Sequence, residues 1–204
     1  MSLPILYSYR RCPFAIRARM ALKYAGIAIE TIEISLKDKP AVMLQASPKG
    51  TVPVLITKEG MVIEESLQII RWALTNNDPD NWLKNDGNAL IASLITENDG
   101  TFKQALDRYK YAIRLPKKSE AEHRAGGEVF LSKLETMLNQ QLFLSGKNIG
   151  IADIAIFPFI RQFTGVDRTW FENAPYPKLR AWLRARIESD LFLSVMHKPL
   201  IHLK

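Results

Sequence analysis

The sequence predicts a chain of two parts, an α/β domain with the element order βαβ-α-ββα and an all-helical domain after it. Two observations favour this organisation. In the first eighty residues, short strand-like runs alternate with segments whose apolar residues recur at helical spacing. Beyond a polar, proline-containing break at 75–82, every apolar segment has helical spacing. We therefore expect domains at 1–76 and 86–204, joined by a linker at 77–85.

The elements of the first domain follow from local signals. We expect, in order, a strand at 4–9, a helix at 13–25, a strand at 27–34, a short helix at 40–44, a hairpin of 54–57 and 61–63, and a helix at 66–74. Pro13 suits the first position of its helix, Gly26 ends that helix, and Ser66 is a candidate N-cap for the last one. A small mixed sheet with helices on both faces, in this order, is typical of a thioredoxin-like domain.

The second domain is predicted to contain four main helices, at 86–113, 119–140, 151–163 and 177–189. The segment 151–163 is apolar on nearly all sides, which indicates a helix buried at the centre of the domain.

Composition limits the classes of function. The chain is 47% hydrophobic and 24% charged, as expected for a globular protein, and no apolar run reaches the ~18 residues that cross a membrane. The N-terminus lacks the features of a signal peptide, and one cysteine cannot form an internal disulfide, so we expect a cytoplasmic protein. The net charge of +7 comes without a basic run of five, which favours anionic small ligands over nucleic acid. Scattered histidines and the absence of a cysteine cluster predict no metal site.

The single cysteine, Cys12, lies in the stretch "LYSYRRCPFAIRARMAL", where the first strand ends and the first helix begins. The free N–H groups and the positive end of that helix point toward its sulfur, and Arg10 and Arg11 add positive charge. These features favour a thiolate, with a pKa below the usual value of about 8.5, and a thiolate attacks disulfides. A buried, inert cysteine remains the alternative. Ala15 stands where a resolving cysteine would, so a redox cycle needs an external thiol.

Three further segments describe a ligand for this site. Pro53 in "TVPVL" is a candidate cis proline, and Val52 before it would present its backbone to an extended ligand; a trans turn proline is the alternative. Glu65 and Ser66 open a helix, where an ammonium and a carboxylate can be bound, although a plain N-cap explains them too. Lys37 and Lys39 lie in the loop after the second strand, where either could meet a second carboxylate; a solvated loop lysine is the alternative. Together they fit glutathione, a tripeptide with a central thiol.

The segments "YSYRRCPFAIRARMAL", "LKDKP", "TVPVL" and "EES" resemble, in order and spacing, those of cytosolic glutathione transferases, most closely the omega class and its bacterial relatives. The resemblance implies the glutathione transferase fold and glutathione as cosubstrate. It implies that Cys12 is catalytic and forms a mixed disulfide with glutathione. The implied glutathione-binding residues are Phe14, Lys39, Val52, Pro53, Glu65 and Ser66. A homodimer is also implied.

The helical half resembles the family more loosely. "NIGIADIAIFPF" is similar to the family's capping box and hydrophobic staple, with Asp153 in the box and Ile149 and Ile154 in the staple. Gly150 replaces the usual Ser or Thr, which we expect to remove one side-chain hydrogen bond. Candidates for a second-substrate pocket, which would take a small electrophile or disulfide, are Tyr109, Phe102, Arg161 and Trp170.

The leading hypothesis is an omega-like, glutathione-dependent thiol transferase. One alternative is a non-catalytic protein-binding module similar to the stringent starvation proteins, which the intact set of site residues argues against. Another is a detoxifying transferase that conjugates glutathione to electrophiles. For that chemistry a Tyr or Ser mechanism through Tyr7, Ser8 or Tyr9 stays open.

Overall fold

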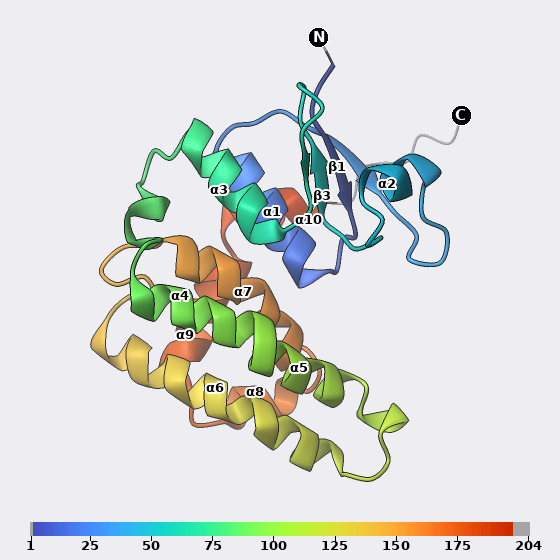
Figure 1. Cartoon of the computed structure of the whole chain (residues 1–204). Coiled ribbons are helices and arrows are strands. Elements are labelled where there is room, and N and C mark those ends of the chain that lie inside the picture. Colours follow the sequence, from blue (N-terminus) through green and yellow to red (C-terminus); the bar gives the residue numbers. More distant parts are fainter. Residues whose placement is uncertain (1, 198–204) are drawn as a thin grey trace. The chain divides into compact units, whose positions relative to one another are not determined.

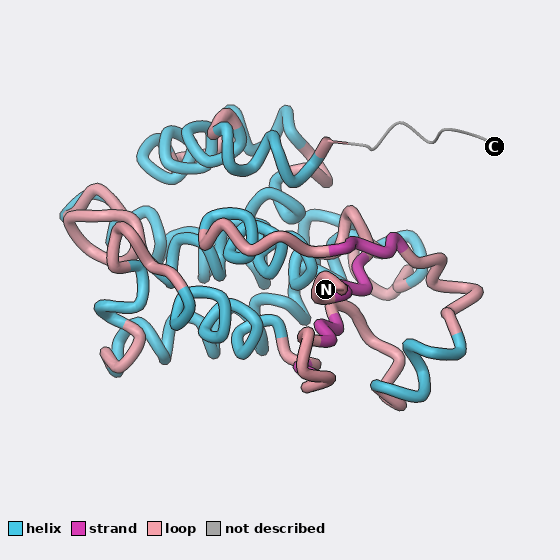
Figure 2. Tube along the Cα trace, turned by 90° about the horizontal axis from the view of Figure 1, so that it is seen from above, coloured by secondary structure: helices cyan, strands magenta, loops and turns pink. Residues whose placement is uncertain are grey.

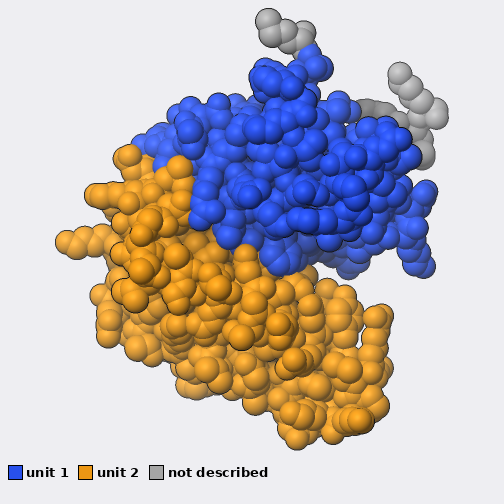
Figure 3. Space-filling view, viewed as in Figure 1, with its two compact units in different colours: residues 1–79, 187–204 blue, residues 80–186 orange. Residues whose placement is uncertain are grey.

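The computed structural model describes residues 2–197 and divides into two compact units. One comprises residues 1–79 with 187–204, and the other residues 80–186 (Figure 3). No helix within the described residues is both long enough and apolar enough to cross a membrane.

The first unit is built on a four-stranded mixed sheet with the order β2-β1-β3-β4 (Figures 1 and 2). β1 (Ile5–Ser8) pairs in parallel with β2 (Glu30–Glu33) and antiparallel with β3 (Val54–Ile56). β4 (Val62–Ile63) closes the predicted hairpin against β3. The predicted order of elements along the chain, βαβ-α-ββα, is therefore confirmed.

Helices cover both faces of this sheet, as predicted (Figure 1). On one face, Tyr7 of β1 and Val54 of β3 pack with Met43 of α2 (Ala41–Ala46). Leu6 points to the opposite face because side chains alternate along a strand, and it is fully buried there. On that side α1 (Pro13–Tyr24) and α3 (Ser66–Asn76) pack against each other. The start of α1 lies close to the end of β1, because only residues 9–12 connect the two elements.

A helix that sequence patterns did not reveal also belongs to the first unit. α10 (Asp190–Met196) packs on α1, and Phe192 is its buried residue. The prediction that assigned all of 86–204 to the helical domain thus differs from the structure at its C-terminal end. A contact between segments more than 160 residues apart leaves no local signal, which explains the difference.

The second unit is all-helical. Its helices are α4 (Ala89–Glu97), α5 (Lys103–Lys110), α6 (Glu120–Gln140), α7 (Ile151–Thr164), α8 (Arg168–Asn173) and α9 (Pro177–Ile187), with short 3-10 turns at Trp82–Asn85 and Ala112–Arg114. The predicted helix at 86–113 is interrupted by a π-helical segment, Asn98–Phe102. The prediction of a buried helix at 151–163 is confirmed, since only Arg161 and Gln162 of α7 are partly exposed.

The N-terminus of α7 corrects one prediction. Gly150 has no side chain to cap the helix, yet the hydrogen bond is made: Ala152 N–H donates to Ser145 Oγ at 3.2 Å. A Cβ on Gly150 would lie 2.9 Å from that same oxygen, so Ser145 occupies the space of the missing side chain. Asp153 accepts from the backbone N–H groups of Leu144, Ser145 and Gly150 and from Trp182 Nε1. The cap is therefore supplied from the preceding loop instead of being lost.

α6 begins with a complete capping box. Glu122 N–H donates to Ser119 Oγ, and the Glu122 carboxylate accepts from the Ser119 N–H at 2.7 Å. The hydrogen bonds that the backbone N–H and the hydroxyl of Ser119 donate to this carboxylate hold the pKa of the Glu122 carboxyl below its usual value.

Candidate active site

Cys12 is the N-cap residue of α1, with Pro13 at the first helical position, as predicted. Its own N–H donates to Tyr9 O at 2.9 Å, and its carbonyl accepts from Ile16 N–H at 2.9 Å. The side chain is partly exposed, and the thiol donates to Val52 O at 3.8 Å. The sulfur therefore lies at the positive end of α1 and beside the backbone that precedes β3.

The Val52–Pro53 peptide bond is cis, as predicted, and Pro53 is buried directly before β3. Lys39 approaches the same loop, because a Cβ built on Gly50 would lie 3.2 Å from Lys39 Nζ. Gly50 has φ +59°, a backbone conformation that favours glycine. The structure thus brings Lys39 to the loop that ends in Val52.

Arg17 connects two predicted site residues, Ser66 and Phe14. Its Nε donates to Ser66 Oγ at 2.9 Å, and its guanidinium lies 5.0 Å from the ring centroid of Phe14. Arg17 is 1% exposed and Ser66 is 3% exposed, so this link between α1 and α3 is buried. Glu65, and not Ser66, is the N-cap residue of α3, and its side chain makes no capping hydrogen bond. The prediction that Ser66 caps the helix is therefore wrong, because its hydroxyl accepts from Arg17 instead.

Glu65 is already paired with a cation of the chain. Lys49 Nζ lies 2.9 Å from a Glu65 carboxylate oxygen and 3.8 Å from one of Glu64. The hydrogen bond to Glu65, together with the negative charge of both carboxylates, raises the pKa of the Lys49 ammonium above its usual value. Glu65 thus forms an ion pair with Lys49, and its predicted role of pairing with a ligand's ammonium stays a prediction.

The alternative nucleophiles are placed less favourably than Cys12. Tyr7 is 3% exposed and packs on the α2 face of the sheet. Ser8 is fully buried, and its hydroxyl accepts from Arg19 Nη1 at 2.5 Å. Tyr9 is partly exposed, and its hydroxyl accepts from Arg11 Nη2 at 3.3 Å.

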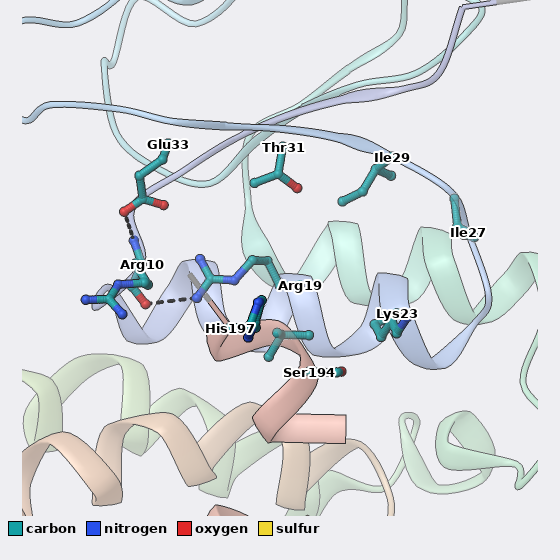
Figure 4. Close-up of a pocket in the computed structure, with 10 residues that line it drawn as sticks. Arg10, Arg19, Lys23, Ile27, Ile29, Thr31, Glu33, Ser194 and His197 are labelled. Atoms are coloured by element: carbon teal, nitrogen blue, oxygen red, sulfur yellow. Dashed lines mark hydrogen bonds between the residues drawn. The ribbon is translucent and has the colours of Figure 1, made fainter. Parts of the chain in front are cut away.

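Arg19 supports the turn that carries Cys12 (Figure 4). Besides the bond to Ser8, its Nη2 donates to Arg10 O at 2.8 Å, while the Arg10 N–H donates to a Glu33 carboxylate oxygen at 2.5 Å. Burial lowers the pKa of Arg19, and the charges of Glu33 and Cys12 oppose this shift. Arg19 is thus a buried cation whose charge interacts with that of Cys12, and the predicted contribution of Arg10 and Arg11 to the potential near the thiol stays a prediction.

The four residues proposed for a second-substrate pocket all lie in the second unit. Phe102 and Tyr109 are 2% and 1% exposed, and their rings lie 5.3 and 4.9 Å from the ring of Phe163. Their burial in this aromatic cluster argues against a contact with a ligand. Arg161 and Trp170 are partly exposed and stay predictions. Among residues 2–197, no group of three or more His, Cys, Asp or Glu side chains is placed to hold a metal ion.

Sequence reasoning missed Arg17, Arg19 and Lys49. Arg17 follows Phe14 by three residues, a helical spacing that brings side chains together, so its contact with the ring could have been found. The other contacts join segments whose proximity depends on the tertiary fold, and no local pattern indicates them.

Comparison with known proteins agrees with this architecture. Residues 6–82 match the family model described as "Glutathione S-transferase, N-terminal domain", and residues 120–185 match "Glutathione S-transferase, C-terminal domain". Glutathione S-transferase omega-1 of Mus musculus is 30% identical over 182 residues, which cover 88% of this chain and 75% of the relative. The protein of the same name from Sus scrofa is 28% identical over 94% of this chain and 79% of its own length. The chain belongs to the glutathione S-transferase family.

Solved structures share the fold. A glutathione transferase of Phanerochaete chrysosporium in complex with oxidized glutathione has a TM-score of 0.82 at 18% identity, with 95% of this chain and 94% of that chain covered. A glutathione S-transferase-I bound with lactoylglutathione has a TM-score of 0.79 at 22% identity, with 96% and 99% covered. At these identities the likeness establishes the fold alone.

Proposed function

We propose that the protein is an omega-like, glutathione-dependent thiol transferase in which Cys12 is the nucleophile. The observation that carries this proposal is the position of Cys12 at the N-cap of α1, with its sulfur 3.8 Å from Val52 O. The N-terminus of a helix favours a thiolate over a thiol, and a thiolate attacks disulfides. Omega-1 enzymes are among the relatives that cover most of this chain, which supports the subtype.

Glutathione is the proposed cosubstrate, because similar structures hold oxidized glutathione and lactoylglutathione. Val52, before cis-Pro53, would pair with the backbone of its cysteinyl residue. Glu65 and Ser66 would bind the γ-glutamyl end, Lys39 the glycine carboxylate, and Phe14 would lie beside the thiol. For the γ-glutamyl ammonium to reach Glu65, Lys49 must leave it.

The reaction has two exchange steps. In the first, the Cys12 thiolate attacks the glutathione sulfur of a mixed disulfide, so that a disulfide forms between Cys12 and glutathione and the substrate leaves as a thiolate. In the second, the thiolate of a free glutathione attacks the glutathione sulfur of that adduct, which releases oxidised glutathione and restores the Cys12 thiolate. The chain needs no second cysteine for this cycle, which agrees with Ala15 at the position of a resolving thiol.

The test compares the wild type with Cys12→Ser. We expect Cys12→Ser to lose transfer of glutathione from a glutathionylated substrate, because a serine hydroxyl is not ionised at neutral pH. Glutathione affinity, measured by calorimetry, is expected to change little, since Val52, Glu65 and Lys39 remain. Full transfer activity in Cys12→Ser would refute the assignment. Conjugation of a chlorinated aromatic that survives this substitution would select the detoxifying transferase instead.

The proposal includes a homodimer, which the family resemblance implies, and a location in the cytoplasm, which the sequence composition predicts. Light scattering of the purified chain measures the first part, and fractionation of cells that express it measures the second. The domain limits at 1–76 and 86–204 also stay a proposal, modified by the association of α10 with the first unit.

A further inference from the structure

A cavity of about 460 Å³ lies within the first unit, bounded by α1, the segment that enters β2, and the end of α10 (Figure 4). One wall is formed by alternate residues of the segment that leads into and through β2: Ile27, Ile29, Thr31 and Glu33. Another wall is formed by Ser194, Val195 and His197. Arg10, Arg19 and Lys23 complete the lining. This volume is in the range of sites that hold small organic ligands.

The lining combines apolar and cationic groups. Ile27, Ile29 and Val195 provide apolar surface, while three basic side chains face one acidic residue. The acidic residue is Glu33, which is exposed and accepts a hydrogen bond from the backbone N–H of Arg10. A concave site with an excess of positive charge attracts anions, and the isoleucines favour an anion with an apolar body.

Arg19 is the one buried cation among the residues that line the cavity. It is 7% exposed, and within the described residues its guanidinium forms no ion pair with a carboxylate. Its Nε is buried without a hydrogen-bond partner. A buried donor without an acceptor is costly, and an anion bound here would accept a hydrogen bond from Nε and add negative charge beside the guanidinium.

The side chain of Met196 occupies the place where such an anion would pair. Its sulfur lies 3.6 Å from Arg19 Nη2 and is a weak acceptor. Methionine is unbranched and flexible, so a carboxylate can displace it at little cost. A carboxylate would also form parallel hydrogen bonds with Nε and Nη2, which a thioether cannot do.

We propose that this cavity binds a small monocarboxylate with an apolar tail, whose carboxylate pairs with Arg19 and whose tail lies against Ile27, Ile29 and Val195. The site is distinct from the proposed glutathione-binding residues, none of which line the cavity. Arg19 also donates to Ser8 and Arg10, the residues that lead to Cys12, so a bound carboxylate would contact the support of the catalytic turn.

The test uses octanoate as the probe on the full chain, with binding measured by calorimetry and the location by NMR contacts to the methyl groups of Ile27, Ile29 and Val195. We expect octanoate to bind about tenfold or more tightly than 1-octanol, which has the same tail without the charge. Saturating glutathione should leave the affinity for octanoate unchanged. Equal binding of the alcohol, or displacement of octanoate by glutathione, would overturn the proposal.

Two tryptophan variants of α10 separate the cavity from the surface of the helix. Val195→Trp fills the cavity and is expected to weaken octanoate binding about tenfold or more, because the tail loses its space. Leu193→Trp is the matched control, since Leu193 is 53% exposed and does not line the cavity. Its affinity should match the wild type. Unchanged binding in Val195→Trp, or no binding of octanoate to the wild type, would overturn the assignment.

Discussion

The adjacent glycines 126 and 127 of α6 are predicted to respond to alanine in opposite directions. A Cβ on Gly127 would lie 2.2 Å from Phe163 Cε2 and 2.6 Å from Phe163 Cζ, both far inside contact distance. A Cβ on Gly126 would meet only the Cβ of Ala105, at an ordinary 3.8 Å. The ring of Phe163 is fully buried between other aromatic rings, so it has little freedom to move away from Gly127.

The expected magnitudes follow from two opposing contributions. Replacing a glycine inside a helix by alanine stabilises by about 0.5–1 kcal/mol, because the unfolded chain loses conformational freedom. Forcing an extra carbon into a packed core destabilises by about 1–3 kcal/mol. Gly126→Ala has only the first contribution, so it should be about 0.5–1 kcal/mol more stable than the wild type. In Gly127→Ala the second contribution outweighs the first, and a net loss of about 1–2 kcal/mol is expected.

Urea unfolding of the full chain, followed by far-UV circular dichroism, measures both differences. Gly126→Ala is the internal control for helix propensity, since the two positions are neighbours in one helix. If Gly127→Ala were as stable as Gly126→Ala, Phe163 would not be packed against Gly127, and the described contact between α6 and α7 would be refuted.

Three further predictions test other parts of the account. Gly150→Ser should destabilise the protein by about 1–3 kcal/mol, because its Cβ would meet Ser145. Adding Ser145→Gly should restore most of the lost stability in thermal melts. If stability were not restored, the two side chains would not compete for the same space. Lys49→Gln should tighten glutathione binding, because Glu65 loses the ammonium group that competes with the ligand. Calorimetry at low salt measures the affinity, with Lys49→Arg as the control. Weaker binding would mean that Lys49 contacts the ligand itself. Glu122→Ala should be less stable than the wild type at pH values above the usual carboxyl pKa of about 4.3. The difference in stability should shrink as the pH falls below that value, because the folded-state pKa of Glu122 is lowered. A difference that does not change with pH would contradict this prediction.

The predictable part of the fold rests on local signals. Apolar spacing was sufficient for α1, α6 and α7, and the run "KEG" between two apolar segments was sufficient for the hairpin of β3 and β4. α10 was not predicted, because a helix of seven residues shows little periodicity. Its contact with α1 joins segments that are far apart in the sequence, so no local pattern indicates it.

The candidate site divides in the same way. Cys12 at a helix start was predictable because Pro13 suits the first helical position, and cis-Pro53 was predictable from its place in a thioredoxin-like domain. The contacts of Arg17 with Ser66 and of Lys49 with Glu65 were not predictable, since they depend on which side chains the folded sheet and helices bring together. Ser66 is an example: its local sequence predicted a helix cap, but its hydroxyl accepts a hydrogen bond from Arg17, which is distant in the sequence.

The central claim is that Cys12 is a reactive thiol that glutathione can both modify and release. The most direct measurement is the intact mass of the native protein after brief incubation with oxidised glutathione, and again after reduced glutathione is added. The account predicts one glutathione adduct, located on Cys12 by peptide mapping, that the second step removes. An unmodified native protein, with labelling of Cys12 only after denaturation, would contradict it.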